Sequence, residues 1–247
     1  MTIQEIMKGL QQDGHGTKAM GGQVADDILP YVKSAHALDR LGHGKIVVID
    51  FVHCSFPYVS PSILLKLQQI RNARTKGDED LIDDRQLFDI KNIISSYFAL
   101  LKKANTISES SVLHFDLSIE ATVCKEMIHI SLSPCLCNTE KSVILGVCML
   151  TYSARKRPGN ALVKLPQADE HYEYRHDGWV LAKNSHLTNM EKVVIVNSIN
   201  GKSIKDIAKI LSVSIVTVKA HRTNIFKKLR VKNITEAVQY AEDYNLI

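Results

Sequence analysis

The amino-acid sequence predicts an α+β protein in which an antiparallel sheet with helices precedes a separate all-α domain of four helices. Segments with the apolar–polar alternation of strands occur only before residue 182, whereas residues 187–247 carry helical spacing and helix caps throughout. Residues 187–247 also hold ten basic and five acidic side chains, which accounts for the whole net charge of +5. We therefore expect a neutral first domain at residues 1–152, a connector at residues 153–186 and a basic second domain at residues 187–247.

The first domain is expected to contain helices, two strands, two helices and three strands, in that order. Helical stretches at residues 3–12 and 24–41 flank a glycine-rich segment. This segment has neither a preceding strand nor the G-x-x-x-x-G-K-[ST] spacing of a phosphate-binding loop, so a flexible connection is expected. The later elements are strands at 45–52 and 56–61, helices at 63–73 and 87–101, and strands at 113–121, 128–132 and 143–151.

The connector begins with a basic run at residues 155–157, followed by Pro158 and Gly159. An exposed, solvated loop is expected there, and contact of this run with nucleic-acid phosphates is the alternative. Further on, residues 172–174 and 179–181 flank a His-Asp-Gly turn, which predicts a small β-hairpin.

Two capped helices open the second domain. Thr188 and Glu191 have the spacing of a capping box, and Ser203 and Asp206 repeat it. The first helix ends at Asn200-Gly201, because glycine adopts the left-handed conformation that follows many helices. The apolar residues expected to face the core are Val193, Val194, Val196 and Ile199 in the first helix and Ile204, Ile207, Ala208 and Leu211 in the second.

A third helix follows a tight turn, is capped by Ser214 and runs to about Leu229. At about 100° per residue it has two distinct faces. The packing face consists of Val218, His221, Ile225 and Leu229, and the opposite face consists of Val216, Lys219, Ala220, Thr223 and Lys227. This pattern is typical of the recognition helix of a helix-turn-helix motif, and an ordinary helical hairpin with a solvated basic face is the alternative.

The outer face of this third helix has the residue types that contact DNA. Lys219 suits guanine, the Ala220 methyl group suits the methyl group of thymine, and Thr223 suits either role, so these three are expected to read bases. The residues expected to contact phosphates are Thr217, Arg222, Lys227, Lys228 and Lys232. The expected partner is double-stranded DNA.

Residues 201–208, 217–225 and 228–233 resemble the LuxR-type helix-turn-helix, also called the GerE type, and the resemblance covers the whole second domain. It implies that Lys219, Ala220 and Thr223 read bases and that the last helix, residues 235–244, pairs two copies on a near-palindromic promoter site. The dimer contacts expected on that helix are Thr235, Val238, Gln239 and Glu242. The sequence departs from the pattern at Met190, where Arg or Lys is usual, and at Ile215-Val216, where a polar pair is usual.

The element order of the first domain resembles that of PAS sensor domains. Residues 46–51 and 58–61 resemble the start of such domains, and the likeness covers about residues 44–152. It implies a sensor that dimerises and takes haem, flavin, a small metabolite or no ligand. Since no residue signature of these cofactors is evident, the ligand is left unknown and the effector is expected to be a small molecule or a protein.

Cysteine and histidine positions predict no metal site. Five cysteines, an odd number, suit free thiols in a reducing compartment. Cys135 and Cys137 form a C-x-C pair with no second Cys or His pair at metal-binding spacing, so burial is expected and a redox-sensing pair is the alternative. His221 is expected to pack in the core. Tyr240 and Tyr244 are expected in the core and at a dimer contact.

The longest apolar run, residues 143–150, has eight residues against the ~20 needed to span a membrane. Glu5 lies where a signal peptide would carry positive charge, and no apolar run follows it. The protein is therefore expected to have no membrane contact and to be cytoplasmic.

Other functions fit the sequence less well. A phosphoreceiver would have an acidic pair after its first strand, where only Asp50 is found, and an acyl-homoserine-lactone sensor would place Trp in its pocket, whereas Trp179 lies in the connector. The alternatives that stay open are a sigma-factor-like promoter-recognition protein and an enzyme domain tethered to a DNA-binding module, although no catalytic pattern is present. The resemblances together imply a homodimeric transcription regulator that is not an enzyme.

Overall fold

The computed structural model describes residues 24–42, 45–73, 82, 84–103, 111–120, 125–137, 142–153, 158, 160–165, 171–175, 178–182, 187–244 and 246–247. The helix expected at residues 3–12 and the glycine-rich segment after it lie outside these residues. The chain divides into an N-terminal unit, residues 1–152 with 157–180, and a C-terminal unit, residues 153–156 with 181–247.

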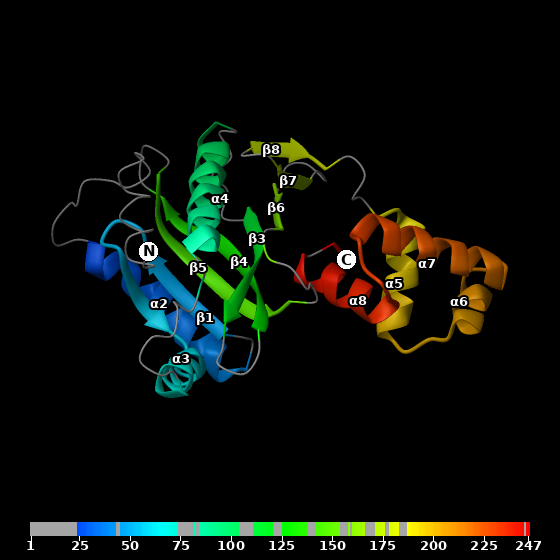
Figure 1. Ribbon diagram of the computed structural model, residues 1–247, viewed down its shortest axis with the longest axis horizontal. Helices are drawn as coiled ribbons and strands as arrows, with labels where there is room; N and C mark the ends of the chain where they lie inside the picture. The colour runs from blue at the N-terminus through cyan, green and yellow to red at the C-terminus, as the bar shows by residue number, and fades with distance from the viewer. Residues whose placement is uncertain are drawn as a thin grey trace. The chain divides into compact units, whose positions relative to one another are not determined.

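One sheet forms the centre of the N-terminal unit (Figure 1). Its strands in the described residues are β1 (Lys45–Asp50), β2 (Ser55–Val59), β3 (Val112–Glu120), β4 (Lys125–Cys137), β5 (Val143–Tyr152), β6 (Ala161–Lys164), β7 (His171–Arg175) and β8 (Gly178–Leu181). They are ordered β2-β1-β5-β4-β3-β6-β7-β8, and each neighbouring pair from β2 to β7 is antiparallel. The expected α+β class with an antiparallel sheet is confirmed, while its PAS type stays a prediction.

Helices cover both faces of this sheet. They are α2 (Val24–Arg40), α3 (Pro61–Ala73) and α4 (Asp84–Lys103). The buried residues Tyr97 and Leu101 of α4 pack with Phe115 of β3 in the larger core cluster. Ile28 of α2 packs with Val48 of β1 in a second cluster.

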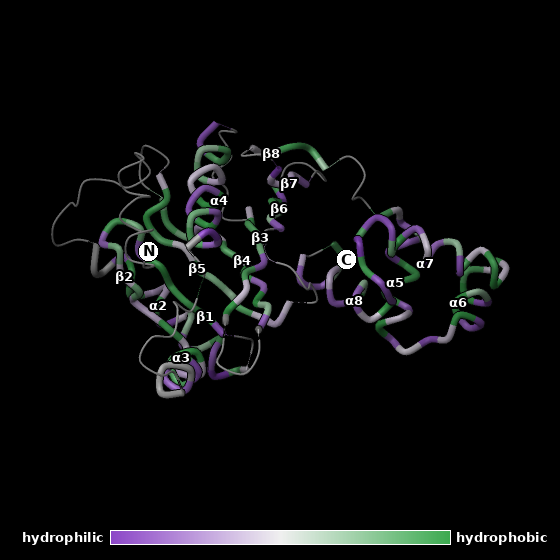
Figure 2. The backbone as a smooth tube through the Cα atoms, in the orientation of Figure 1, coloured by the Kyte–Doolittle hydropathy of each residue, from purple (hydrophilic) through white to green (hydrophobic). Residues whose placement is uncertain are grey.

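Strand β1 contributes to both core clusters, since Val48 belongs to the second and its neighbour Val47 packs against the first. Successive side chains of a strand point to opposite faces, so a strand covered on both faces is apolar along its length. Figure 2 shows β1 and β5 mostly in the colour of hydrophobic residues.

Part of the segment that was expected to be a connector extends the sheet. Residues 171–175 and 178–181 are strands, as expected for the hairpin, and β7 and β8 are neighbours in the sheet. Strand β6 was not predicted from the sequence; it pairs with β3 from Val112↔Lys164 to Phe115↔Ala161. Four residues are too few to show alternation, and their partner strand lies more than 40 residues away in the sequence.

The described part of the C-terminal unit contains four helices, α5 (Asn189–Ile199), α6 (Ile204–Ile210), α7 (Ile215–Leu229) and α8 (Ile234–Asp243). Both expected capping boxes are present, at Thr188 with Glu191 and at Ser203 with Asp206, and Ser214 caps α7. The expected four-helix domain is confirmed.

The expected buried face of α5 was right at Val194 and wrong at its other three residues. The structure buries Glu191, Val194 and Ile195, whereas Val193, Val196 and Ile199 are exposed. Four consecutive apolar residues, 193–196, carry no helical period, so the sequence pattern left the orientation of this helix undetermined.

Within the described part of the chain, no helix is both long enough and apolar enough to cross a membrane.

Candidate nucleic-acid interface and ligand cavity

A tight turn sets α7 against α6. Ser212 adopts a left-handed conformation with φ of 53°, and the Val213 N–H donates to the Ala208 carbonyl over 3.0 Å, which ends α6. The Ser214 hydroxyl then accepts from the Thr217 N–H over 3.0 Å, and the two hydroxyl groups lie 2.8 Å apart. This arrangement is a helix-turn-helix with a fixed first turn on its second helix.

The face of α7 that was expected to read bases is open to solvent. Lys219, Ala220 and Thr223 are all exposed, while Val218 and Ile225 on the packing face are completely buried. The Thr223 hydroxyl donates to the Lys219 carbonyl over 3.1 Å, which directs it along the helix. Three side chains from two adjacent turns of α7 are therefore accessible on one surface, and their contact with bases stays a prediction.

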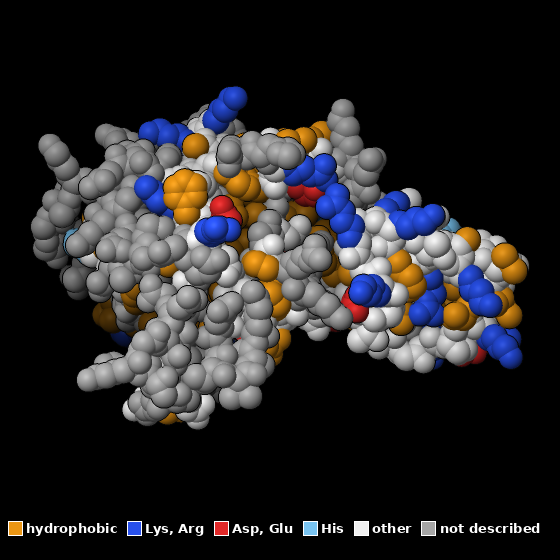
Figure 3. Space-filling view, viewed as in Figure 1, with side chains coloured by type: hydrophobic (Ala, Val, Ile, Leu, Met, Phe, Trp, Pro, Cys, Tyr) orange, Lys and Arg blue, Asp and Glu red, His pale blue; other side chains and the backbone are white. Residues whose placement is uncertain are grey.

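Of the basic residues expected at phosphates, Lys227 is exposed and Arg222 is half-buried, with its guanidinium carbon 5.8 Å from the centre of the Phe226 ring. Thr217 is half-buried and bonded to the helix cap as described above. Figure 3 shows Lys and Arg side chains distributed over the C-terminal unit. Phosphate contact by these three residues stays a prediction.

Lys228 has a partner within the protein, because its ammonium donates to Oε2 of Glu191 in α5 over 2.7 Å. That carboxylate is 3% exposed and also accepts from the Thr188 N–H over 2.7 Å. Burial raises the pKa of Glu191, but the bonds from Lys228 and Thr188 outweigh it, so the pKa lies below its ordinary value. This pair was not predicted from the sequence, which placed Lys228 among the phosphate contacts.

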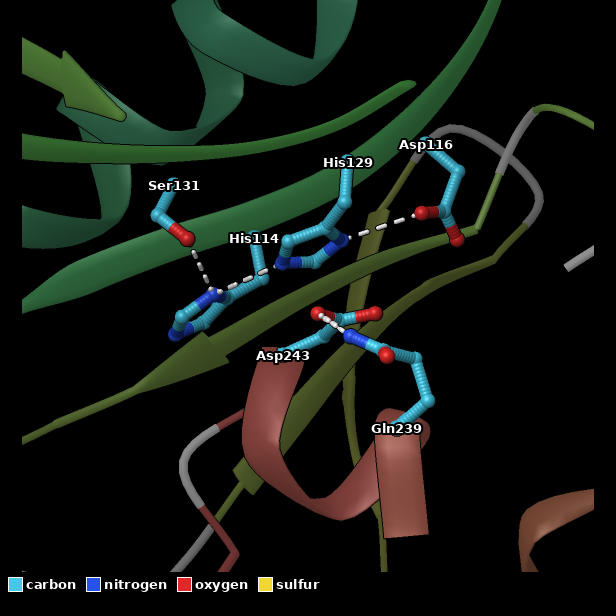
Figure 4. A network of polar contacts seen from close by, with 6 residues as sticks. All are labelled: His114, Asp116, His129, Ser131, Gln239 and Asp243. Carbon is cyan, nitrogen blue, oxygen red and sulfur yellow. Dashed lines mark hydrogen bonds and ion pairs between the residues drawn. The ribbon is translucent and has the colours of Figure 1, made fainter. Parts of the chain in front are cut away.

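The outer strip of α8 is partly accessible. Thr235 and Glu242 are exposed, and Val238 and Gln239 are half-buried. The Gln239 amide donates to Oδ1 of Asp243 over 2.8 Å, as Figure 4 shows. A dimer contact at this strip stays a prediction.

Two aromatic residues and one histidine of the C-terminal unit differ in burial. Tyr240 and Tyr244 are buried and stack with ring centres 4.3 Å apart, so their expected core position is confirmed. His221 is half-buried rather than fully packed.

Among the residues that the structure describes, no cluster of three His, Cys, Asp or Glu side chains could hold a metal ion. The described cysteines, Cys54, Cys135, Cys137 and Cys148, are free thiols, of which only Cys148 is fully buried.

A cavity of about 180 Å³ lies between α4 and the sheet of the N-terminal unit. Its lining is apolar apart from one thiol: Val47, Ile49, Phe51, Phe56, Ile82, Leu87, Ile90, Ile94, Phe115, Leu117, Ile130, Leu132, Cys148 and Leu150. Burial raises the pKa of the Cys148 thiol to about 12, which keeps it neutral. The cavity thus suits an uncharged, apolar molecule.

Polar side chains form a buried chain on β3 and β4 (Figure 4). Nδ1 of His129 lies 3.0 Å from Oδ1 of Asp116, and Nε2 of His129 lies 3.3 Å from Nδ1 of His114. The Ser131 hydroxyl is 3.0 Å from that same His114 nitrogen. Burial, followed by the charges of His129, His171 and Lys164, lowers the pKa of His114 to about 3.

This buried chain of polar side chains was not predicted from the sequence. In β3 and β4 the polar residues of this chain alternate with apolar residues. A strand with one face in water has the same alternating pattern. Only the burial of His114, Asp116 and His129 in the structure distinguishes the two cases.

Comparison with known proteins bears on the C-terminal unit. Residues 185–241 match the family model of bacterial regulatory proteins of the luxR family, named GerE. These residues form a luxR-family domain. The family model covers less than a quarter of the chain, all of it within the C-terminal unit.

Curated relatives match part of the chain. The uncharacterized transcriptional regulatory protein YhcZ of Bacillus subtilis is 40% identical over 82 residues, which cover 33% of this chain and 38% of that protein. The Fimbriae Z protein of Salmonella typhimurium is 41% identical over 61 residues, covering 25% of this chain and 29% of that protein. The chain thus spans about a third of the length of the curated relatives it matches.

Several solved structures align with most of the chain. The phage VqmA–DPO complex covers 89% of this chain and 93% of its own at 14% identity, with a TM-score of 0.28. Nothing about fold or function follows from a likeness at that score.

Proposed function

We propose that this protein is a transcription regulator that binds a near-palindromic promoter site as a homodimer through its luxR-family domain. The observation that carries the proposal is the solvent-facing strip of Lys219, Ala220 and Thr223 on α7. It lies in a domain that matches regulators and holds the whole net positive charge of the chain. Such a helix fits the major groove, where base pairs differ in their donors, acceptors and methyl groups.

Within the interface we assign Lys219, Ala220 and Thr223 to bases and Thr217, Arg222 and Lys227 to phosphates. For Lys228 we favour a structural role, because its ammonium is already bonded to the buried carboxylate of Glu191. The strip of Thr235, Val238, Gln239 and Glu242 on α8 would pair the two domains, so that both recognition helices bind in one event about 34 Å apart.

We further propose that the N-terminal unit is a PAS-like sensor whose effector is a small, uncharged molecule. Its support is the apolar cavity between α4 and the sheet. An apolar cavity of about 150 Å³ takes up a molecule the size of benzene, so the space here is sufficient for a small ring compound.

The DNA proposal is tested by selecting binding sites from randomised duplexes with the full-length protein. We expect a two-fold symmetric consensus for the wild type and for Lys103→Ala, a control at an exposed position of α4. Lys219→Ala should lose preference at particular base pairs of each half-site. Selection that returns no consensus would contradict the proposal.

The sensor proposal is tested with toluene as an uncharged probe. Toluene should raise the unfolding temperature of the wild-type protein, because it binds the folded state only. Ile130→Trp, which places a larger side chain in the cavity lining, should remove the effect. An equal rise for this variant would show that toluene binds elsewhere.

A further inference from the structure

Val216 has the largest exposed fraction, 75%, of the large hydrophobic side chains that the structure describes. It is the second residue of α7, directly after Ile215, which is 40% exposed. Contact with water is unfavourable for the apolar side chain of a valine. A valine with so large an exposed fraction at a fixed position is therefore a candidate for contact with a partner.

The position of Val216 is well defined. The Ser214 cap bonds to the Thr217 N–H and hydroxyl, and these bonds hold the first turn of the helix on either side of Val216. A β-branched side chain in a helix has one strongly preferred rotamer, so its methyl groups point in a fixed direction.

Val216 shares the outer face of α7 with the residues assigned to DNA. At about 100° per residue, positions 216, 220, 223 and 227 fall within about 60° of one another. Val216 is the first of this row at the N-terminal end of the helix, the end whose residues contact base edges in helix-turn-helix proteins. The neighbouring cations Lys219 and Lys227 are also exposed, so the surface is apolar at its tip and positively charged along its length.

We propose that Val216 is a specificity-determining residue that recognises thymine methyl groups in the major groove. The inference rests on the proposed DNA binding and adds a contact to it. A valine has no donor or acceptor for phosphates or base edges, and the C5-methyl group of thymine is the apolar group that the major groove presents. The positive flanks favour duplex DNA over a second protein surface as the occupant.

The test replaces single thymines by deoxyuracil in the duplex selected by the full-length protein, which removes one methyl group and nothing else. Burial of a methyl group contributes about 0.8 kcal/mol. Replacing one contacted thymine should therefore lower the affinity of the protein for the duplex about three- to fivefold. For Val216→Ser this loss should vanish at the thymines that Val216 contacts. Val196→Ser, at an exposed valine of α5, is the matched control and should retain it.

The outcomes separate this inference from the proposed function. A deoxyuracil effect at a different thymine that persists in Val216→Ser belongs to the Ala220 methyl group. The inference is overturned if the wild type tolerates deoxyuracil at every position, or if Val216→Ser keeps the complete wild-type pattern. It is also overturned if Val216→Ser changes only the sedimentation of the protein, which would indicate a protein contact. Failure to bind any DNA sequence preferentially would overturn the proposed function itself.

Discussion

The Lys228 ammonium in α7 donates to the Glu191 carboxylate in α5, and the same carboxylate oxygen accepts from the backbone N–H of Thr188, the residue that caps α5. One buried acid thus joins the start of one helix to the end of another. Lys227, the sequence neighbour of Lys228, is exposed and is assigned to DNA phosphates instead. Two adjacent lysines are therefore expected to differ in what they stabilise.

Lys228→Met should destabilise the luxR-family domain by about 1–3 kcal/mol, because it leaves a buried carboxylate without its charged donor. Hydrogen exchange of the α5 and α7 amides across a denaturant series measures this. Lys227→Met is the matched control and should change stability by less than about 0.5 kcal/mol. Equal effects would contradict the structural role of Lys228.

Lys227→Ala should weaken binding to all DNA sequences alike, since phosphates carry no sequence information. The slope of log K against log salt concentration should fall in magnitude by about one per protomer. Titrations at several salt concentrations measure this slope. A slope that does not change would remove Lys227 from the phosphate contacts.

Lys219→Ala and Thr223→Ala should each relax preference at particular base pairs by about 1–3 kcal/mol, because the side chains face outward from α7 toward the proposed groove. Competition between the selected duplex and single-base variants measures the loss, with Lys103→Ala as the control. If Lys219→Ala and Thr223→Ala both return the wild-type consensus, the outer face of α7 does not read bases.

Val238→Asp and Glu242→Lys should lower affinity for a two-half-site duplex toward that for one half-site, because the strip on α8 is expected to pair the domains. The full-length variants should still sediment as dimers through the N-terminal unit. Glu242 is exposed, so its variant tests the contact even if Val238→Asp perturbs the fold, which circular dichroism would reveal. An unchanged ratio of the two affinities for both variants, or a monomeric wild type, would contradict this arrangement.

Acid should destabilise the N-terminal unit partly through His114. Its folded pKa of about 3 lies below the ordinary value of 6.5, so between these values the unfolded chain binds a proton that the folded chain does not. The contribution of His114 to the free energy of unfolding is fully present above pH 6.5. It falls by about 1.4 kcal/mol per pH unit as the pH drops from 6.5 toward the folded pKa. In denaturation series at pH 6 and 5, His114→Gln should reduce the loss of unfolding free energy by about 1.4 kcal/mol per pH unit. If the unfolding free energy of this variant changed with pH as it does in the wild type, the burial of a neutral His114 imidazole would be contradicted.

Much of the fold could be predicted from short-range patterns. The caps at Thr188, Ser203 and Ser214 are bonds between residues three apart, and the alternation of β3 and the helical period of α7 are properties of continuous segments. The outward face of α7, with Lys219, Ala220 and Thr223, followed from the same period. For these features the chemistry of neighbouring residues is sufficient, because the interactions that create them are local.

Only the tertiary structure determined the rest. It selected the buried face of α5, paired Lys228 with Glu191, added β6 to the edge of β3, and buried His114 beside His129. Each of these joins segments between 15 and about 50 residues apart, or chooses among faces that the residue pattern leaves equivalent. Local hydrogen bonding and periodicity contain no information about which distant segment will exclude water from a given side chain, and that exclusion decides whether a lysine, an acid or a histidine is free for a ligand or committed to the fold.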